Sequence, residues 1–342
     1  MSSRGYWLHG LRLAVDGWEG AAAAVHDRLA RLPPLLPPAH GAAPPFDLCF
    51  TFESTADPAE FERCAPRRPP RARPVYDPPQ GEVLWDREAD LLYLELGPRL
   101  RALCEPAAGA VRLAALDPGP EEAWLLSHPL FTLPLAELAK RRGLFPLHAA
   151  GLCRDGRALV LPGTSGAGKS TLAVALARAG LDFLGDDTLF LAPGLDQSGK
   201  GLRLLAFPDE IDLTERSLEF FPDLAAHLAP ARPAGWRKRQ LAAEHLGNPS
   251  GGVTWECAPG LLVFPRVAGR QESALAPLGR DAALLELAGN VLLTEPRSSQ
   301  GHLDALAALV AASDCYRLET GSDLDAAARL LAGLFPPAES AS

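Results

Sequence analysis

The sequence has no long hydrophobic run and no excess of basic charge. None of its 342 residues lie in a stretch of about 18 consecutive apolar residues, the length that a membrane-spanning helix requires. The formal net charge is -9, which argues against a protein held on nucleic acid by general electrostatic attraction. No long apolar segment follows Arg4 near the start of the chain. We therefore expect a cytoplasmic protein with neither a membrane nor a nucleic acid as its partner.

Clustered cysteines are also absent. The sequence contains no Cys-x-x-Cys pair and no histidine at zinc-ligand spacing from a cysteine, which argues against a structural zinc site. A disulfide framework is typical of short exported chains, and this chain is long. We expect reduced thiols at all six positions, which are Cys49, Cys64, Cys104, Cys153, Cys257 and Cys315.

The first third of the chain has the composition of a β-rich domain with proline-rich connectors. Two such connectors, 32–38 and 66–74, interrupt it, because proline fixes φ and removes a backbone donor. Alternating apolar residues predict strands at 46–52 and 91–96. Since the chain exceeds a typical domain of roughly 100–200 residues, we divide it near residue 122. We interpret 1–122 as an N-terminal domain for substrate or partner recognition.

After residue 122 helical and strand patterns alternate, as in α/β proteins. We assign 123–336 to a second domain and 337–342 to a disordered tail. The predicted helices are 125–142, 170–179, 281–293, 303–312 and 324–334, and the predicted strands are 157–161, 183–187 and 315–318.

A phosphate-binding motif lies between a predicted strand and a predicted helix. The segment Gly163-Thr164-Ser165-Gly166-Ala167-Gly168-Lys169-Ser170 satisfies G-x-x-x-x-G-K-[ST], and Thr171 follows it. Glycines at positive φ let successive backbone N–H groups converge on phosphate oxygens. Lys169 would neutralise the β- and γ-phosphates, and Ser170 would be a ligand to Mg²⁺. The sequence thus predicts ATP bound by residues 163–171 together with Mg²⁺.

Two adjacent acids, Asp186 and Asp187, end the strand that follows this helix. A carboxylate at such a strand end can hold Mg²⁺ beside the bound phosphates. A second carboxylate could accept the proton of a hydroxyl group that receives a phosphoryl group. A solvated pair of surface acids is the structural alternative.

His148 precedes the motif, and with it the chain resembles the HPr kinase/phosphorylase family. The resemblance is closer to the short HPr-kinase-like relatives that have a phosphoenolpyruvate-carboxykinase-type topology. It rests on His148-Ala-Ala-Gly151, on Leu159-Val-Leu-Pro-Gly163 continuing through Ser170, on Ala179-Gly180 and on Gly185-Asp-Asp187. It covers residues 145–187 closely and the remainder loosely.

The resemblance implies a kinase core with a mixed sheet flanked by helices. It also implies that Asp186 is the general base on the acceptor hydroxyl and that Asp187 and Ser170 hold Mg²⁺. His148 would lie beside the transferred phosphate, together with Lys169. Short relatives carry a basic segment that reaches the nucleotide, which makes Lys238 and Arg239, after Arg237, nucleotide-binding candidates; the alternative is a solvated basic loop.

The family's acidic, glycine-rich signature is not recognisable in this sequence, so the resemblance does not extend to phosphorylase activity or to HPr as the acceptor. It implies a serine kinase acting on a peptide or small protein, and a possible homo-oligomer. Two other functions stay open: a small-molecule kinase, and a nucleotide-dependent binding or regulatory protein without transfer. Glu210 and Asp212 could reach the metal or substrate, and Trp236 and Trp255 could pack on a base or peptide.

Overall fold

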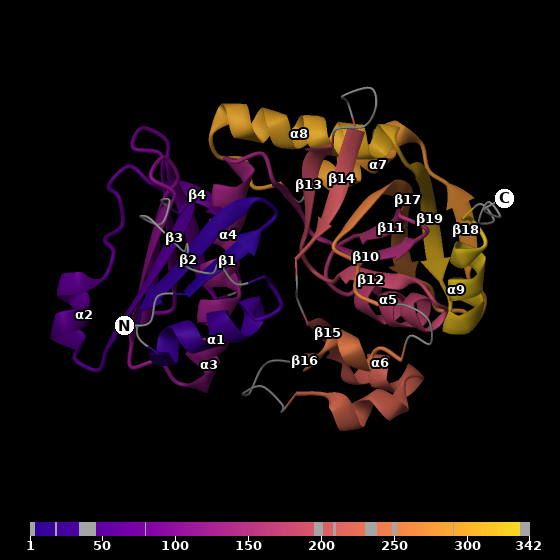
Figure 1. The fold of residues 1–342 in the computed structure, drawn as a ribbon, viewed down its shortest axis with the longest axis horizontal. Coiled ribbons are helices and arrows are strands. Elements are labelled where there is room, and N and C mark those ends of the chain that lie inside the picture. Colours follow the sequence, from indigo (N-terminus) through magenta and orange to yellow (C-terminus); the bar gives the residue numbers. More distant parts are fainter. Residues whose placement is uncertain are drawn as a thin grey trace, which may run out of the picture. The chain divides into compact units, whose positions relative to one another are not determined.

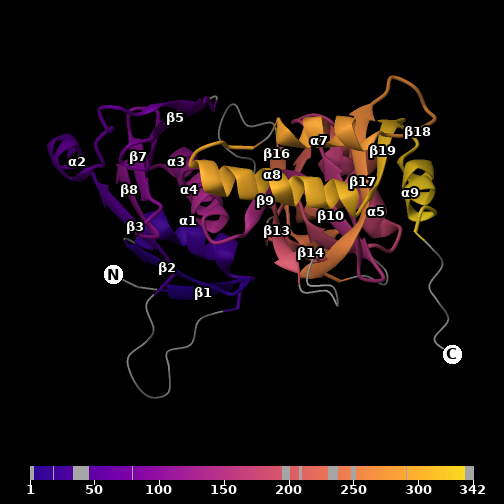
Figure 2. The same cartoon turned by 90° about the horizontal axis from the view of Figure 1, so that it is seen from above.

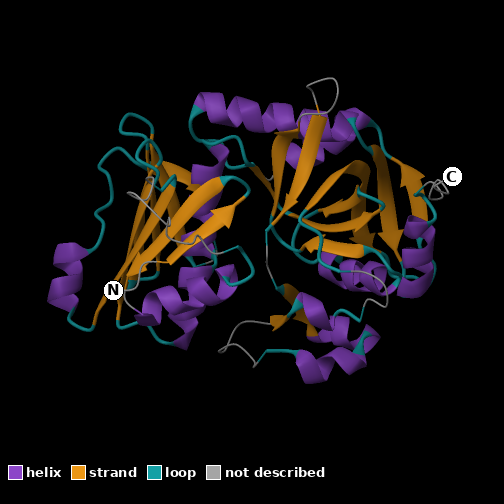
Figure 3. Ribbon diagram, in the orientation of Figure 1, coloured by secondary structure: helices purple, strands orange, loops and turns teal. Residues whose placement is uncertain are grey.

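The structure is a computed structural model. It describes residues 4–17, 19–33, 46–78, 80–194, 201–207, 210–229, 238–247, 252–289 and 291–335. It is a mixed α/β structure in which sheets are flanked by helices (Figures 1 and 3). The expected tail at 337–342, Arg237 and Trp236 lie outside the described residues. All six cysteines are free.

The chain divides into two compact units. One comprises Met1–Arg142 and Leu292–Ser299, and the other Gly143–Val291 and Gln300–Ser342. The division thus falls C-terminal to the expected boundary at residue 122. The reason is that the helices at 120–140 pack with the N-terminal sheet, as the ring contact between Phe50 and Phe131 illustrates.

The N-terminal unit is built on an eight-stranded sheet within the described residues, in the order β1-β2-β3-β8-β7-β6-β5-β4. Strands β2, β3 and β8 run parallel, and the other neighbouring pairs are antiparallel. The strands are β1 (Arg4–Leu8), β2 (Leu11–Gly17), β3 (Leu48–Thr55), β4 (Arg73–Tyr76), β5 (Gly81–Asp86), β6 (Leu91–Leu96), β7 (Leu100–Glu105) and β8 (Ala110–Leu116).

The helices that lie wholly in this unit, among its described residues, are α1 (Glu19–Leu29), α2 (Pro58–Cys64), α3 (Pro120–Ser127) and α4 (Pro129–Lys140). The sequence predicts one helix over 125–142, but the chain forms two, which meet at His128. Pro129 begins the second helix because the first helical position needs no backbone N–H. Gly143, at φ 81°, follows the end of α4.

The second unit contains the larger mixed sheet, in the order β12-β10-β11-β17-β14-β13-β9. β19 pairs with the far end of β17, and β18 pairs with β19. The strands are β9 (Phe145–Leu147), β10 (Ala149–Arg154), β11 (Arg157–Pro162), β12 (Asp182–Gly185), β13 (Leu189–Gly194), β14 (Gly201–Ala206), β17 (Glu256–Val267), β18 (Ala274–Pro277) and β19 (Asp314–Thr320).

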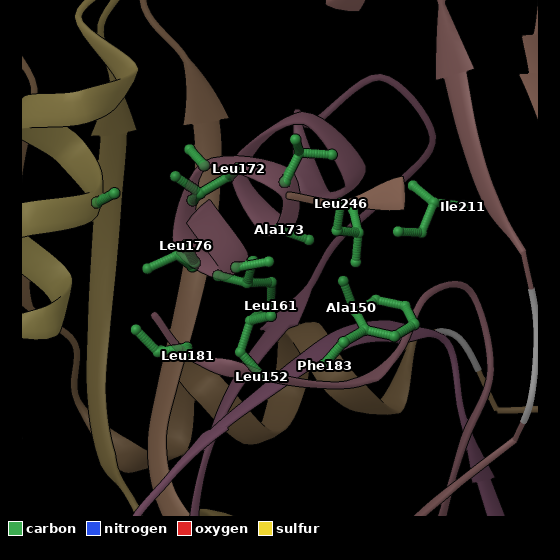
Figure 4. Close-up of a cluster of buried hydrophobic side chains, with 14 of the residues drawn as sticks. Ala150, Leu152, Leu161, Leu172, Ala173, Leu176, Leu181, Phe183, Ile211 and Leu246 are labelled. Atoms are coloured by element: carbon green, nitrogen blue, oxygen red, sulfur yellow. The ribbon is translucent and has the colours of Figure 1, made fainter. Parts of the chain in front are cut away.

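Helices cover both faces of this sheet. One buried cluster joins α5 (Lys169–Arg178) and α9 (Leu324–Ala332) to one face, where Leu172 and Leu176 meet Leu161 and Leu152 (Figure 4). The other cluster joins α7 (Arg280–Ala288) and α8 (Pro296–Ala311), whose residues from Gln300 belong to this unit, to the opposite face. Figure 2 shows α8 from a second direction.

A small two-stranded ribbon lies against the α5 cluster. It consists of β15 (Ile211–Thr214) and β16 (Lys238–Leu241), and the short helices α6 (Glu215–Phe220), η1 (Pro222–His227) and η2 (Ala243–His245) accompany it. Ile211 and Leu241 are fully buried in the cluster. No helix within the described residues is both long enough and apolar enough to cross a membrane.

Candidate functional site

The glycine loop, residues 163–168, connects β11 to the first residue of α5. Gly163, Gly166 and Gly168 have φ values of 150°, 85° and 93°, in the region that side chains other than glycine rarely adopt. Gly168 is also the N-cap of α5. The loop therefore precedes a helix N-terminus, where backbone N–H groups and the helix dipole favour an anion.

Lys169 follows the glycine loop; its side chain turns back to the backbone of that loop and the residue is only 8% exposed. Its Nζ donates to the carbonyl oxygens of Gly163 at 2.7 Å and Thr164 at 3.2 Å. Burial lowers the pKa of the ammonium group, and the charges of Asp186 and Asp187 act in the opposite direction. The sequence-predicted phosphate ligand is thus a buried cation held by the backbone of the loop.

His148, in the connection between β9 and β10, joins Lys169 to Asp187. Its Nε2 lies 3.2 Å from Lys169 Nζ, and its Nδ1 lies 2.9 Å from the carbonyl oxygen and 3.2 Å from the carboxylate of Asp187. The ammonium group can only donate, so we assign the imidazole proton to Nδ1. Asp187 adopts a φ of 72°, which ends β12 at Gly185, before both predicted strand-end acids.

Asp186 is buried, 2% exposed, and differs sharply from its neighbour Asp187. Within the described residues its Oδ1 has no hydrogen-bond partner. Burial raises the pKa of Asp186 from 3.8 to about 6, and a hydrogen bond from Ser170 acts against this rise. A carboxyl group that titrates near neutral pH and has a free oxygen can accept a proton from a substrate.

Asp212, on β15, belongs to the same group of charges. Its charge contributes to the raised pKa of Asp186. Its strand neighbours Ile211 and Leu213 are buried in the α5 cluster, so Asp212 lies on the other face of the ribbon. From the sequence alone, segment 207–212 is a weaker candidate for the site than the basic segment 237–239, because a Phe-Pro-Asp-Glu run is common in surface turns. Glu210 is exposed.

The two basic candidates on β16 point to different neighbours. Lys238 pairs with Thr214 in the ribbon, and its positive charge contributes to the lowered pKa of Lys169. The guanidinium group of Arg239 instead donates to the carbonyl oxygens of Ala229 at 3.0 Å and Leu228 at 3.4 Å. Lys238 is therefore the residue of this segment that influences the glycine loop.

A chain of hydroxyl groups links α5 to the ribbon. Thr171 Oγ1 lies 2.8 Å from Ser217 Oγ, which lies 3.0 Å from Thr214 Oγ1. Thr214 is also the N-cap of α6, because its side chain accepts from the backbone N–H of Ser217. Sequence reasoning missed Ser217; the only available signal was the Thr-x-x-Ser spacing before a helical segment.

The site offers oxygen ligands for one hard cation. No group of three or more His, Cys, Asp or Glu side chains suited to a metal occurs in the described ranges. Mg²⁺ bound through nucleotide phosphates needs only one or two protein oxygens, because waters and phosphates complete its coordination. Ser170 and Asp187 fit that requirement, which leaves the Oδ1 of Asp186, without a partner among the described residues, available to a substrate.

Comparison with known proteins finds similarity among solved structures but not among family models or curated proteins. No family model matches the chain, and no curated protein is similar to it. Among solved structures, the chain is similar to the Hpr(Ser) kinase/phosphatase from Coxiella burnetii, at 14% sequence identity and a TM-score of 0.22. The alignment covers 39% of this chain and 77% of that chain. A TM-score of this size supports no argument, so function must be argued from the site residues.

Proposed function

We propose that this protein is a Mg²⁺-dependent kinase that transfers the γ-phosphoryl group of ATP to a hydroxyl group, namely a serine of a peptide or small protein. The observation that carries this proposal is Asp186, a buried carboxyl group with a pKa of about 6 and one oxygen that has no partner in the described part of the chain, among Lys169, Asp187 and Asp212. The choice of a serine of a peptide or small protein as the acceptor rests on the motif resemblance.

Each residue of the site has one task in this reaction. The glycine loop and Lys169 hold the phosphates. The acceptor oxygen attacks the γ-phosphorus while its proton passes to Asp186. The bond from that phosphorus to the β,γ-bridging oxygen breaks, and ADP leaves with the electron pair. Mg²⁺, held by Ser170 and Asp187, would neutralise the phosphate charge.

The hydrogen-bonded chain from Asp187 through His148 to Lys169 sets the positions of these charges. His148 holds the main chain of Asp187 on one side and the ammonium group on the other. Since phosphoryl transfer depends chiefly on positioning and on electrostatic stabilisation, this rigid arrangement supports a kinase function. Lys238 would add a second positive charge beside the phosphates.

The first test is a transfer assay with γ-labelled ATP and Mg²⁺. The purified protein is incubated with peptides and small proteins encoded beside its gene, and Lys169→Ala serves as the control. Label in an added acceptor that is lost with the control variant supports the proposal. ATP binding without transfer to any acceptor contradicts the kinase and favours a nucleotide-dependent binding protein.

A further inference from the structure

The order of the strands predicts the direction in which a bound nucleotide would lie across the sheet. β12, which leads to Asp186 and Asp187, lies on the β10 side of β11, whereas β17 and β19 lie on its other side. Under the proposed function, on which this inference rests, the γ-phosphate must meet Asp186. The nucleoside end therefore extends the opposite way, over the carboxyl ends of β17 and β19.

Val267, the last residue of β17, borders the glycine loop on that side. Its Cγ2 lies 3.3 Å from the position that a Cβ on Gly168 would occupy. Leu261 and Val263, on the same strand face, pack in the cluster beneath α5. Val267 faces the same way but lies beyond them and is 46% exposed. It thus presents apolar surface directly beside the last glycine of the loop.

Thr320 is the register partner of Val267 on the parallel strand β19. It is 5% exposed, and in the described part of the chain its Oγ1 has no hydrogen-bond partner. A buried hydroxyl group without a partner is unfavourable, so a ligand that pairs with it would gain a hydrogen bond at little cost. Paired residues of neighbouring strands share a face, which places this hydroxyl group on the same side as Val267.

Backbone hydrogen bonds hold the two loops that follow these strands together. The N–H of Ser322 donates to Arg270 O at 3.0 Å, and the N–H of Asp323 donates to Gln271 O at 3.1 Å. Ala268 N–H donates to Thr320 O at 2.8 Å. This edge of the sheet is therefore preorganised, which lowers the entropy cost of ordering a ligand against it.

We propose that Val267 and Thr320 form the nucleobase subsite of this protein. The planar heteroaromatic base of the nucleoside triphosphate packs on the side chain of Val267, and a polar ring atom pairs with Thr320 Oγ1. The triphosphate extends from this subsite along the glycine loop toward Asp186.

The test distinguishes the contribution of the nucleoside to binding affinity from that of the phosphates. Affinities for Mg²⁺-ATP and for Mg²⁺ with inorganic tripolyphosphate are measured by titration calorimetry on the full chain. We expect Val267→Ser and Thr320→Val each to weaken ATP binding about three- to tenfold, because a contact or a hydrogen bond to the base is lost. Both variants should bind tripolyphosphate as the wild type does.

Two matched controls address general effects. Val253→Ser changes another exposed valine, beside β12. Ser313→Ala removes a second buried hydroxyl group that lacks a partner within the described residues, at the opposite end of β19. Neither should change either affinity. Thr320→Val should also fold, because replacing an unpaired hydroxyl group by a methyl group relieves its desolvation.

The outcomes distinguish the subsite from the proposed function. Unchanged ATP affinity in both variants, or an equal loss of ATP and tripolyphosphate affinity, would overturn the nucleobase subsite while leaving the kinase proposal standing. If the wild-type protein binds neither ligand, the proposed function fails and the subsite fails with it. A loss confined to ATP supports both.

Discussion

Each of the two units buries a lysine side chain near carboxyl groups. Within the described residues, the charged groups around the lysine are all paired in one unit but not in the other. In the N-terminal unit, Lys140 Nζ donates to Leu292 O at 2.9 Å and to Thr294 Oγ1 at 2.7 Å, and pairs with Glu137 at 2.8 Å. Arg141 binds Glu137 at 2.7 Å and Asp90 at 2.8 Å. Burial lowers the pKa of Lys140, and the charge of Glu137 offsets part of that effect.

In the other unit, the charged groups around Lys169 are not all paired within the described residues. Lys169 is held by carbonyl oxygens and by His148 and forms no ion pair among the described residues, while Asp186 keeps a buried oxygen without a partner in the described ranges. A buried polar group without its partner costs stability. The complete network stabilises the fold, whereas the incomplete one leaves polar groups that a ligand could pair with.

The largest effect that this comparison predicts is the loss of catalysis in Asp186→Asn. Removal of a proton acceptor should lower the transfer rate about 10²–10⁴-fold, with ATP affinity nearly unchanged. A rate assay and a binding titration check this. Asp182→Asn, on the same strand β12, is the matched control and should keep its activity. Undiminished transfer in Asp186→Asn would mean that another group is the base.

The second prediction compares the two lysines by stability. Lys140→Met leaves Glu137 buried without its cation, so we expect a loss of about 3–5 kcal/mol in the free energy of unfolding. Lys169→Met removes a buried charge that has no ion-pair partner in the described residues, and should cost far less. Denaturant unfolding of both variants measures the difference. Equal losses would contradict the functional reading of the Lys169 site.

Opposite pH dependences follow from one carboxyl group in each unit. The pKa of Asp186 is raised from 3.8 to about 6 by burial, so its protonated form favours the folded state and that stability is lost as pH rises from about 4 to about 6. Asp90 is only half-buried, with 30% of its side chain exposed; burial raises its pKa, but the hydrogen bond from Arg141 and the charge of Arg141 lower it overall. Its stabilising effect is present above its ordinary pKa of 3.8 and is lost as pH falls through the lower folded-state value.

Unfolding measured from about pH 2 to about pH 7 tests both effects, because the contribution of Asp90 is lost only below its ordinary pKa of 3.8. Relative to wild type, Asp186→Asn should gain roughly 3 kcal/mol at neutral pH, and this gain should shrink toward pH 4. Asp90→Asn should instead be destabilised at neutral pH, with the deficit shrinking in acid. Parallel pH profiles for the two variants would show that the environments of the two carboxyl groups do not differ in this way.

The smallest predicted effects separate Lys238 from Arg239. Lys238→Ala removes a charge near Lys169 and should weaken ATP binding about three- to tenfold. Arg239→Ala should leave ATP affinity unchanged and lower the free energy of unfolding by about 1 kcal/mol, because its bonds go to backbone carbonyls. Binding titrations and denaturant unfolding of both variants check these two expectations. A larger affinity loss in Arg239→Ala would reverse the assignment.

Several elements could be predicted because their signals are local. β6 covers the predicted residues 91–96, and α5 lies within one residue of the predicted helix at each end. Glycines at positive φ mark the loop and, at Gly180, the second residue after α5, since they act on the backbone of their own segment. The break between α3 and α4 was not predicted, although Pro129 marks it locally, and the short extent of β12 was not predicted because the positive φ of Asp187 belongs to a residue type that rarely adopts it.

Local sequence signals are enough to specify the glycine loop, the helix behind it and the order of His148, the loop and the two acids along the chain. Which of the two acids is buried follows from the folded chain, because the surroundings of Asp186 include segments distant in the sequence, such as β15 with Asp212. The folded chain also determines that Arg239 turns to a neighbouring backbone and that Thr320 lies beside Val267. Local signals specify backbone conformation, whereas charge environment depends on residues that only folding brings together.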